Sequence, residues 1–247
     1  MKNLFIPFLG AFLAISCQKK DAAPIEAEDA DWVKLEIPTE WSAGEQAYSL
    51  IGDIDHTLLV STIVGLYATS DQGKTWQKLR TTSQIVWAQM PRNDTTFALN
   101  SYQTNSQGDK LAACFAEEFS TDFGRTWAYT DILGPNSYEK YRAFRYPLGQ
   151  VSAAGYACRI RENTVSVSNS TSRLVVASDL LRTNAASGQQ VMRLPGRHYL
   201  NNLYLDARNR LYVAASGVGF DAETGTVVDF TKGSSTAVVY VSRRPLP

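Results

Sequence analysis

One eight-residue pattern occurs twice in this chain and restricts its possible folds more than any other feature. Residues 69–76, TSDQGKTW, and residues 120–127, STDFGRTW, agree at every fixed position of the pattern [ST]-x-D-x-G-x-T-W. The two copies begin 51 positions apart. Two copies at such a spacing indicate an internal structural repeat of about that length.

Each copy has the composition of a tight turn between two β-strands. Gly73 and Gly124 can adopt the positive φ that such a turn requires. Asp71 and Asp122 can accept hydrogen bonds from backbone N–H groups of the turn. The tryptophans are expected to bury their rings against a neighbouring sheet. The expected structural set is Ser70, Asp71, Gly73, Thr75, Trp76, Ser120, Asp122, Gly124, Thr126 and Trp127.

The rest of the chain from Trp32 onward reads as short strands. No window of a dozen residues sustains helical periodicity, whereas runs rich in β-branched and aromatic residues recur between Gly, Asn, Asp and Ser. Examples are WVKLEI (32–37), RLYVAA (210–215) and AVVYVS (237–242). The sequence therefore predicts an all-β domain, which could be a sandwich, a barrel or a propeller.

The duplicated motif resembles the Asp-box, or BNR repeat, of sialidases and many other β-propellers. This resemblance implies a ring of four-stranded blades, with the Asp-box turns on the face opposite the ligand face. It also implies a structural role for Asp71 and Asp122 and no role for them as a catalytic pair.

The strand runs predict five blades, with four or six as alternatives. The five regions are 46–79, 84–130, 140–168, 172–194 and 199–242. Four blades follow if 140–194 is one elaborated blade. Strand 32–37 precedes any inner strand, so we expect it to pair with strand 237–242 and to close the ring, which removes exposed edges.

The N-terminus carries a localisation signal. Lys2 precedes an uncharged stretch of 13 residues, Leu4–Ser16, which is shorter than the about 20 residues that span a bilayer. Ala14-Ile15-Ser16-Cys17 resembles the lipobox of bacterial lipoproteins, which implies a signal peptide over 1–16 and lipidation of Cys17. Residues 17–31 then form a tether, and 32–247 form the propeller domain.

This signal predicts an outer-membrane lipoprotein that contacts the membrane through its lipid anchor. Gln18-Lys19-Lys20-Asp21 resembles the surface-export signal of Bacteroidetes lipoproteins, and surface and periplasmic locations both stay open. The charge is balanced, with 24 Lys and Arg against 24 Asp and Glu. No basic face for nucleic acid is implied.

No cofactor or metal is expected. Asp53-Ile54-Asp55-His56 reads as a polar turn, and HExxH, GxSxG and phosphate-loop motifs are absent from the sequence. Cys114 and Cys158 match no metal-binding spacing, so a disulfide and two buried free thiols are the alternatives.

Loops 100–109 and 131–140 are expected at the ligand face. They and the neighbouring segment supply the candidate ligand-binding residues Tyr102, Tyr138, Arg142 and Arg145. Arginine beside aromatic rings suits recognition of carboxylates, phosphates or sugars.

Three functional hypotheses follow. The first is a non-catalytic binding module for a glycan or a protein partner. The second is a sialidase-like glycoside hydrolase, and the third is an envelope assembly or scaffold factor. A sialidase needs an arginine triad, a Tyr–Glu nucleophile pair and an Asp acid/base. Its Arg-containing motif precedes the first Asp-box, whereas Phe144-Arg145-Tyr146-Pro147 follows both boxes here. We therefore favour the binding module and expect no catalytic residues.

Overall fold

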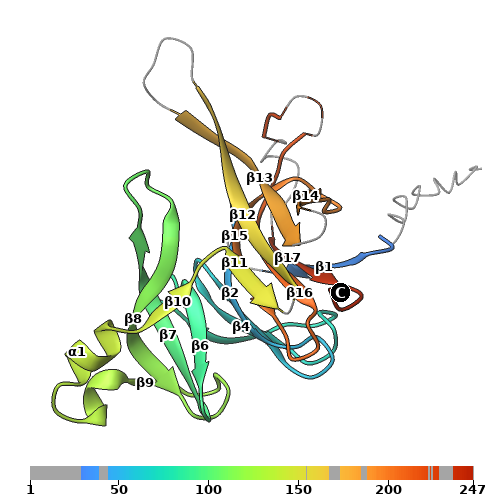
Figure 1. The fold of residues 1–247 in the computed structure, drawn as a ribbon. Coiled ribbons are helices and arrows are strands. Elements are labelled where there is room, and N and C mark those ends of the chain that lie inside the picture. Colours follow the sequence, from blue (N-terminus) through green and yellow to red (C-terminus); the bar gives the residue numbers. More distant parts are fainter. Residues whose placement is uncertain are drawn as a thin grey trace, which may run out of the picture.

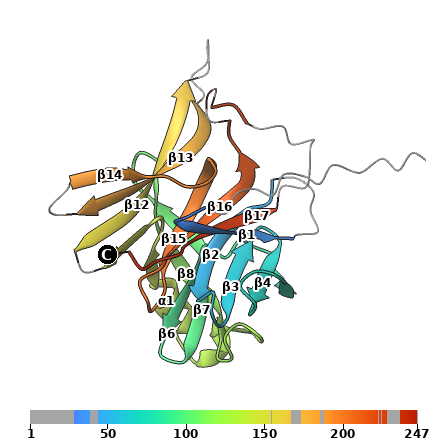
Figure 2. The ribbon, with the colours of Figure 1, turned by 90° about the vertical axis from the view of Figure 1, so that its right-hand side faces the viewer.

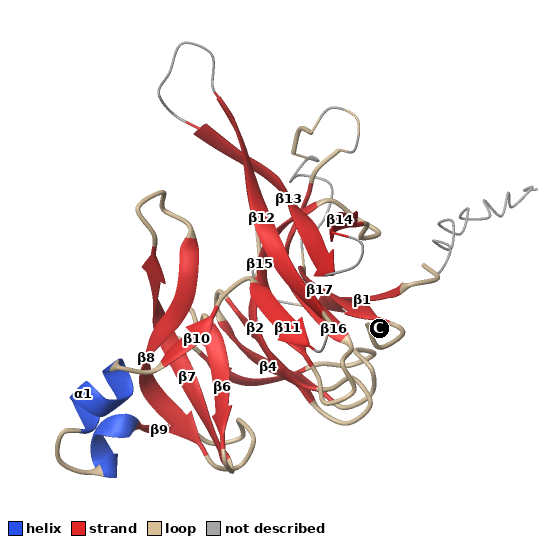
Figure 3. Ribbon diagram, viewed as in Figure 1, coloured by secondary structure: helices blue, strands red, loops and turns tan. Residues whose placement is uncertain are grey.

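The protein is an all-β propeller of four blades (Figure 1). The computed structural model describes residues 29–38, 44–153, 155–166, 173–184, 188–221, 223, 225–227 and 236–246. The predicted signal peptide, Cys17 and the predicted tether up to residue 28 lie outside the described residues. Among these residues, helix is confined to one corner (Figure 3), as η1 (Thr130–Leu133) and α1 (Ser137–Arg142).

Blades 1 and 2 contain the two Asp-box copies. Blade 1 consists of β2 (Ala47–Gly52), β3 (Leu58–Thr62), β4 (Gly65–Thr69) and β5 (Gln77–Thr81). Blade 2 consists of β6 (Ala88–Arg92), β7 (Thr95–Thr104), β8 (Lys110–Ser120), β9 (Ala128–Tyr129) and β10 (Arg145–Pro147). Strands β9 and β10 pair with opposite halves of β8, so both lie at the outer edge of the blade.

The sequence predicts five blades, whereas the structure has four, and the third sheet accounts for the difference. Blade 3 consists of β11 (Gln150–Ala153), β12 (Tyr156–Ser166), β13 (Arg173–Asn184) and β14 (Gly188–Met192). The regions 140–168 and 172–194 were predicted as separate blades. Their strands β12 and β13 instead pair along most of their length in one long hairpin, so the break between the two regions is a turn within a single blade.

The expected ring closure is confirmed. Blade 4 consists of β15 (His198–Leu205), β16 (Leu211–Gly219), β17 (Ala237–Ser242) and β1 (Trp32–Ile37). Strand β1 runs antiparallel to β17, from Trp32 opposite Ser242 to Ile37 opposite Ala237 (Figure 2). Trp32, Leu35 and Ile37 are buried, so the first strand of the domain completes the core of its last blade.

The ring has two different faces because successive strands alternate in direction. One face, here called the Asp-box face, carries both Asp-box turns together with the β2–β3 and β15–β16 turns. The other, called the mouth face, carries the β3–β4 and β7–β8 turns. The β7–β8 and β12–β13 hairpins extend beyond the ring on the mouth side (Figure 1).

The two Asp-box turns have the same hydrogen-bond pattern. Asp71 accepts bonds from the Thr75 N–H at 2.9 Å and the Thr75 hydroxyl at 2.6 Å. Asp122 accepts the matching bonds from Thr126 at 2.8 and 2.7 Å. These bonds lower the pKa of each carboxyl to about 2. The largest contribution comes from the Thr75 hydroxyl for Asp71 and from the Thr126 N–H for Asp122. Both aspartates therefore act as ionised acceptors that fasten their own turns.

The hydroxyl residue of the first box is Thr69, and the expected Ser70 does not have that role. Ser120 accepts the Gly124 N–H and donates to Asp122, and Thr69 does the same for Gly73 and Asp71. Ser70 follows the hydroxyl residue, just as Thr121 follows Ser120. The motif [ST]-x-D itself places the hydroxyl residue two positions before the aspartate, at Thr69, so the expectation for Ser70 is wrong.

Each box also packs on the preceding blade. A Cβ on Gly124 would lie 2.6 Å from a methyl of Leu59 in blade 1, and one on Gly73 would lie 2.7 Å from a methyl of Leu35 in β1. Trp127 packs against the buried cluster of Ile51, Leu59 and Leu66. The two glycines therefore have two roles: they adopt the positive φ of the turn, and their lack of a side chain lets neighbouring blades approach closely.

Candidate functional site

Aromatic rings and a charged pair gather at the mouth face. The mouth cluster, as we call it, consists of Trp87, Tyr102, Lys110, Glu162 and Tyr199. These residues come from blades 2, 3 and 4, so only the closed ring brings them together. The cluster lies between the two projecting hairpins, because Lys110 is next to the turn at the tip of the β7–β8 hairpin and Glu162 lies on β12.

Lys110 occupies the middle of the cluster. Its Nζ lies 5.2 Å from the ring centroid of Trp87, 5.8 Å from that of Tyr102 and 5.5 Å from that of Tyr199. The same atom donates to the Tyr199 hydroxyl at 3.1 Å and lies 3.8 Å from the Glu162 carboxylate. Cation–π attraction and the carboxylate both favour a positive charge at this point.

Tyr199 and Glu162 form a direct pair. The Tyr199 hydroxyl donates to Oε1 of Glu162. Burial, followed by this hydrogen bond and the charge of Glu162, raises the pKa of the Tyr199 phenol far above its usual value. Tyr199 is therefore a neutral donor at physiological pH, and the phenolate is strongly disfavoured.

Backbone contacts fix the position of Trp87. Its N–H donates to the Leu99 carbonyl at 2.9 Å, and its own carbonyl accepts from the Asn202 side chain at 3.1 Å. The same Asn202 amide accepts from the Gly149 N–H at 3.0 Å, so one buried side chain joins blades 2, 3 and 4. The ring of Tyr48 meets the Trp87 indole edge-on at 5.0 Å.

A polar groove of about 420 Å³ adjoins the cluster between blades 2 and 3. Lys110 and Glu162 line both the groove and the cluster, and their side chains are 24% and 35% exposed. Tyr102 is 41% exposed, so a ligand can reach its ring. The remaining polar residues of the groove lining are Asn105, Asp109, Gln150, Arg159, Arg161 and Asn201.

The four candidate ligand-binding residues lie in two places. Tyr102 belongs to the mouth cluster. Tyr138, Arg142 and Arg145 instead lie together at the outer edge of blade 2, where the Arg142 guanidinium donates to the Tyr138 hydroxyl at 2.9 Å. Arg145 donates to Gln103 at 3.0 Å and to the Arg142 carbonyl at 2.6 Å. Loop 131–140, expected at the ligand face, forms η1 and α1 against β8 at this edge.

Sequence reasoning did not identify Trp87, Lys110, Glu162 or Tyr199. Trp87 lies within a run that reads as an ordinary strand, and the other three are scattered over separate segments without a shared spacing. The only sequence signal was indirect, because Lys110 directly follows the 100–109 loop that was expected at the ligand face.

Comparison with known proteins yields similarity to solved structures. No family model matches the sequence, and no curated protein matches it. The tricorn protease matches with 10% identity and a TM-score of 0.30, over 78% of this chain and 26% of that one. The AfRom2 CNH domain matches with 12% identity and a TM-score of 0.20, over 80% and 59% of the two chains.

A third match is an extracellular domain from B. thetaiotaomicron, described as part of a one component system. Its identity is 11% and its TM-score 0.24, over 81% of this chain and 29% of that one. This chain thus covers less than two thirds of each of the three proteins. Such TM-scores support no conclusion about activity, and the propeller assignment rests on the four sheets.

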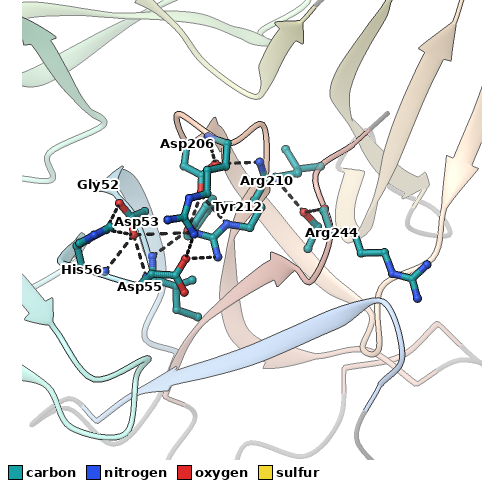
Figure 4. Close-up of polar contacts among 12 residues, drawn as sticks. Gly52, Asp53, Asp55, His56, Asp206, Arg210, Tyr212 and Arg244 are labelled. Atoms are coloured by element: carbon teal, nitrogen blue, oxygen red, sulfur yellow. Dashed lines mark hydrogen bonds and ion pairs between the residues drawn. The ribbon is translucent and has the colours of Figure 1, made fainter.

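The Asp-box face carries a second polar cluster, which joins blades 4 and 1 (Figure 4). The buried carboxylate of Asp206 accepts bonds from the N–H of Arg208 and the N–H and Nε of Arg210, at 2.7 to 2.9 Å. Arg210 also lies 2.9 Å from Asp55 in the β2–β3 turn. Tyr212 donates to Asp206 at 3.1 Å and accepts from the Ile54 N–H at 2.9 Å.

This second cluster contains no free reactive group. Each carboxylate in it is bound by a guanidinium, a backbone N–H or His56. In the part of the chain that the structure describes, no group of three or more His, Cys, Asp and Glu could hold a metal ion. We therefore interpret the cluster as a clamp between the last and the first blade.

Cys114 and Cys158 are not bonded to each other and are both free thiols. Burial raises the pKa of the Cys158 thiol to about 11, so it stays protonated and is a poor nucleophile. Of the two open alternatives, the free thiols are the one observed, although only Cys158 is fully buried. Within the described ranges, no helix has the length and apolar character needed to cross a membrane.

Proposed function

We propose that this protein is a non-catalytic binding protein of the cell envelope, anchored by a lipid on Cys17, whose mouth face binds a glycan or a protein partner. The observation that supports this function is the mouth cluster beside its polar groove. Exposed aromatic faces with a few polar groups suit sugar rings and protein side chains.

The position of the first strand agrees with this proposal. Strand β1 begins at the Asp-box face, where Trp32 lies opposite Ser242 and the Arg243 N–H donates to the Asp31 carbonyl at 2.8 Å. A lipid tether that ends at Asp31 therefore joins the domain on the side away from the mouth cluster. This arrangement leaves the mouth face open to a ligand, on whichever side of the outer membrane the domain lies.

Replacing Tyr102 by alanine should weaken ligand binding about tenfold or more, because a central aromatic contact often dominates an interface. The chain from residue 18 onward, which retains every described residue, is tested on a glycan array and against solubilised envelope proteins. Tyr129→Ala is the matched control, since this tyrosine is 60% exposed at the outer edge of blade 2. A ligand that Tyr102→Ala binds as well as the wild type does would contradict the proposed site.

A second candidate function is glycoside hydrolysis of the sialidase type. The observation in its favour is the Tyr199–Glu162 pair, because sialidases use a Tyr–Glu pair as nucleophile. Two observations oppose it: the pKa of Tyr199 is raised rather than lowered, and Arg161, one of two arginines lining the groove, is held by Asp179.

We expect the wild-type chain to release no fluorophore from a fluorogenic sialoside beyond the buffer blank, because burial and the hydrogen bond to Glu162 keep Tyr199 protonated. Tyr199→Phe is assayed in parallel, since it retains the ring and removes only the hydroxyl. Turnover by the wild type that Tyr199→Phe abolishes would establish the hydrolase and refute the binding-only function.

A further inference from the structure

The mouth cluster has the composition of a binding site for a positive charge. Three aromatic rings and one carboxylate surround the Lys110 ammonium, with each ring centroid between 5.2 and 5.8 Å from Nζ. Aromatic faces and a carboxylate in this arrangement also recognise the ammonium groups of ligands. The chain thus supplies both the cage and its occupant.

The walls of the cage are held independently of Lys110. Trp87 and Tyr102 meet at 4.5 Å with an angle of 65° between their rings. Trp87 is fixed by Leu99, Asn202 and Tyr48, and Tyr199 is bonded to Glu162. None of these contacts involves the lysine, so its departure would leave the walls in place.

The occupant, by contrast, is attached in a way that permits exchange. Lys110 is the first residue of β8 and follows a turn whose residues 106–109 are exposed. Its side chain is 24% exposed and lines the groove. A flexible four-carbon side chain at this point can turn into solvent without moving the strand. Glu162 and the three rings would then lose the ammonium group that Lys110 supplies.

We propose that the mouth cluster is an ammonium-binding cage in which Lys110 is an exchangeable internal occupant, and that the ligand of this face presents an alkylammonium group that takes its place. This inference rests on the proposed function and specifies the ligand chemistry. A lysine side chain and a trimethylammonium group share that chemistry. A ligand of this kind competes with Lys110, so binding to the wild type is weaker than binding to an empty cage.

The test compares wild type, Lys110→Ala and Lys110→Ser by isothermal titration calorimetry, using the chain from residue 18 onward. The probes are choline, Nα-acetyl-lysinamide and 3,3-dimethylbutanol, which is the uncharged counterpart of choline. We expect Lys110→Ala to bind at least one of the two ammonium probes about tenfold more tightly than the wild type does, and about tenfold more tightly than it binds the alcohol. The preferred ammonium probe distinguishes the two sources.

Further replacements locate the site. Trp87→Leu or Glu162→Gln, added to Lys110→Ala, should each remove most of the gain, whereas Tyr129→Ala should leave it unchanged. A folded Lys110 variant that binds neither ammonium probe more tightly than the alcohol would overturn the proposal. If neither variant folds, the wild type is titrated with the same probes. At least one ammonium probe must then bind more tightly than the alcohol and must shift the indole NMR signal of Trp87, and failure of both probes would overturn the proposal.

Failure of the ammonium-cage test can be distinguished from failure of the proposed binding function. Binding on the glycan or envelope screen that depends on Tyr102, together with no ammonium preference in the Lys110 variants, would remove the cage and leave the binding face. A chain that shows neither effect would lose both.

Discussion

A chain that begins at Gly44, and so lacks β1, is expected to lose its cooperative unfolding transition. Trp32, Leu35 and Ile37 are 5%, 4% and 0% exposed. Burial of each such side chain contributes about 1.5–3 kcal/mol, and together they approach the about 5–15 kcal/mol net stability of a typical domain. Removal of the strand also exposes the edge of β17 to other chains.

The measurement is urea denaturation followed by tryptophan fluorescence, with size-exclusion chromatography to detect aggregation. Lys34→Ala is the control within the same strand, because its pair with Glu36 is exposed, with side chains 37% and 54% accessible. Such a pair contributes at most about 1 kcal/mol. A shortened chain that remains monomeric and unfolds at the wild-type urea concentration would show that the ring does not need this strand.

Asp206→Ala should destabilise the protein by about 3–5 kcal/mol, the usual cost of removing one partner from a buried ion pair. The Asp206 side chain is 1% exposed and that of Arg210 is 11% exposed. Loss of the carboxylate leaves Arg210 buried with Asp55 at 2.9 Å and Asp53 at 3.8 Å as its remaining carboxylate partners. It also removes the acceptor of two backbone N–H groups in the β15–β16 turn.

The shift of the urea midpoint at unchanged slope measures this effect. Arg208→Ala is the matched control, because its ion pair with Asp55 lies at the surface, with side chains 62% and 31% exposed. That variant should lose no more than about 1 kcal/mol. Equal losses in the two variants would mean that the clamp does not depend on the buried carboxylate.

Features that depend on local chemistry could be predicted from the sequence. The Asp-box pattern specifies acceptor, glycine and hydroxyl, and these residues form the same bonds in both turns. Strand 32–37 was recognisable as the closing strand because it precedes any inner strand. The helix α1 was not predicted, since the six residues Ser137–Arg142 are too few to show a helical period.

The blade count and the mouth cluster depended on distant contacts. A turn within a long hairpin looks the same in sequence as a boundary between blades, which is why β12 and β13 were assigned to different blades. The mouth cluster forms a candidate site only because the fold brings together Trp87, Lys110, Glu162 and Tyr199, which lie far apart in the sequence. Among them, a tryptophan in a strand indicates a packed core, and a lysine at a turn indicates solvent.

The pairing of β1 with β17 has a consequence for biogenesis. Trp32 pairs with Ser242, so the two strands lie almost at opposite ends of the domain sequence. A ribosome makes β1 early and its partner only after the other three blades, and pairing over such a separation is slow. If the chain is exported as proposed, we expect the incomplete ring to stay loosely packed while it passes a translocation channel and to close only after export.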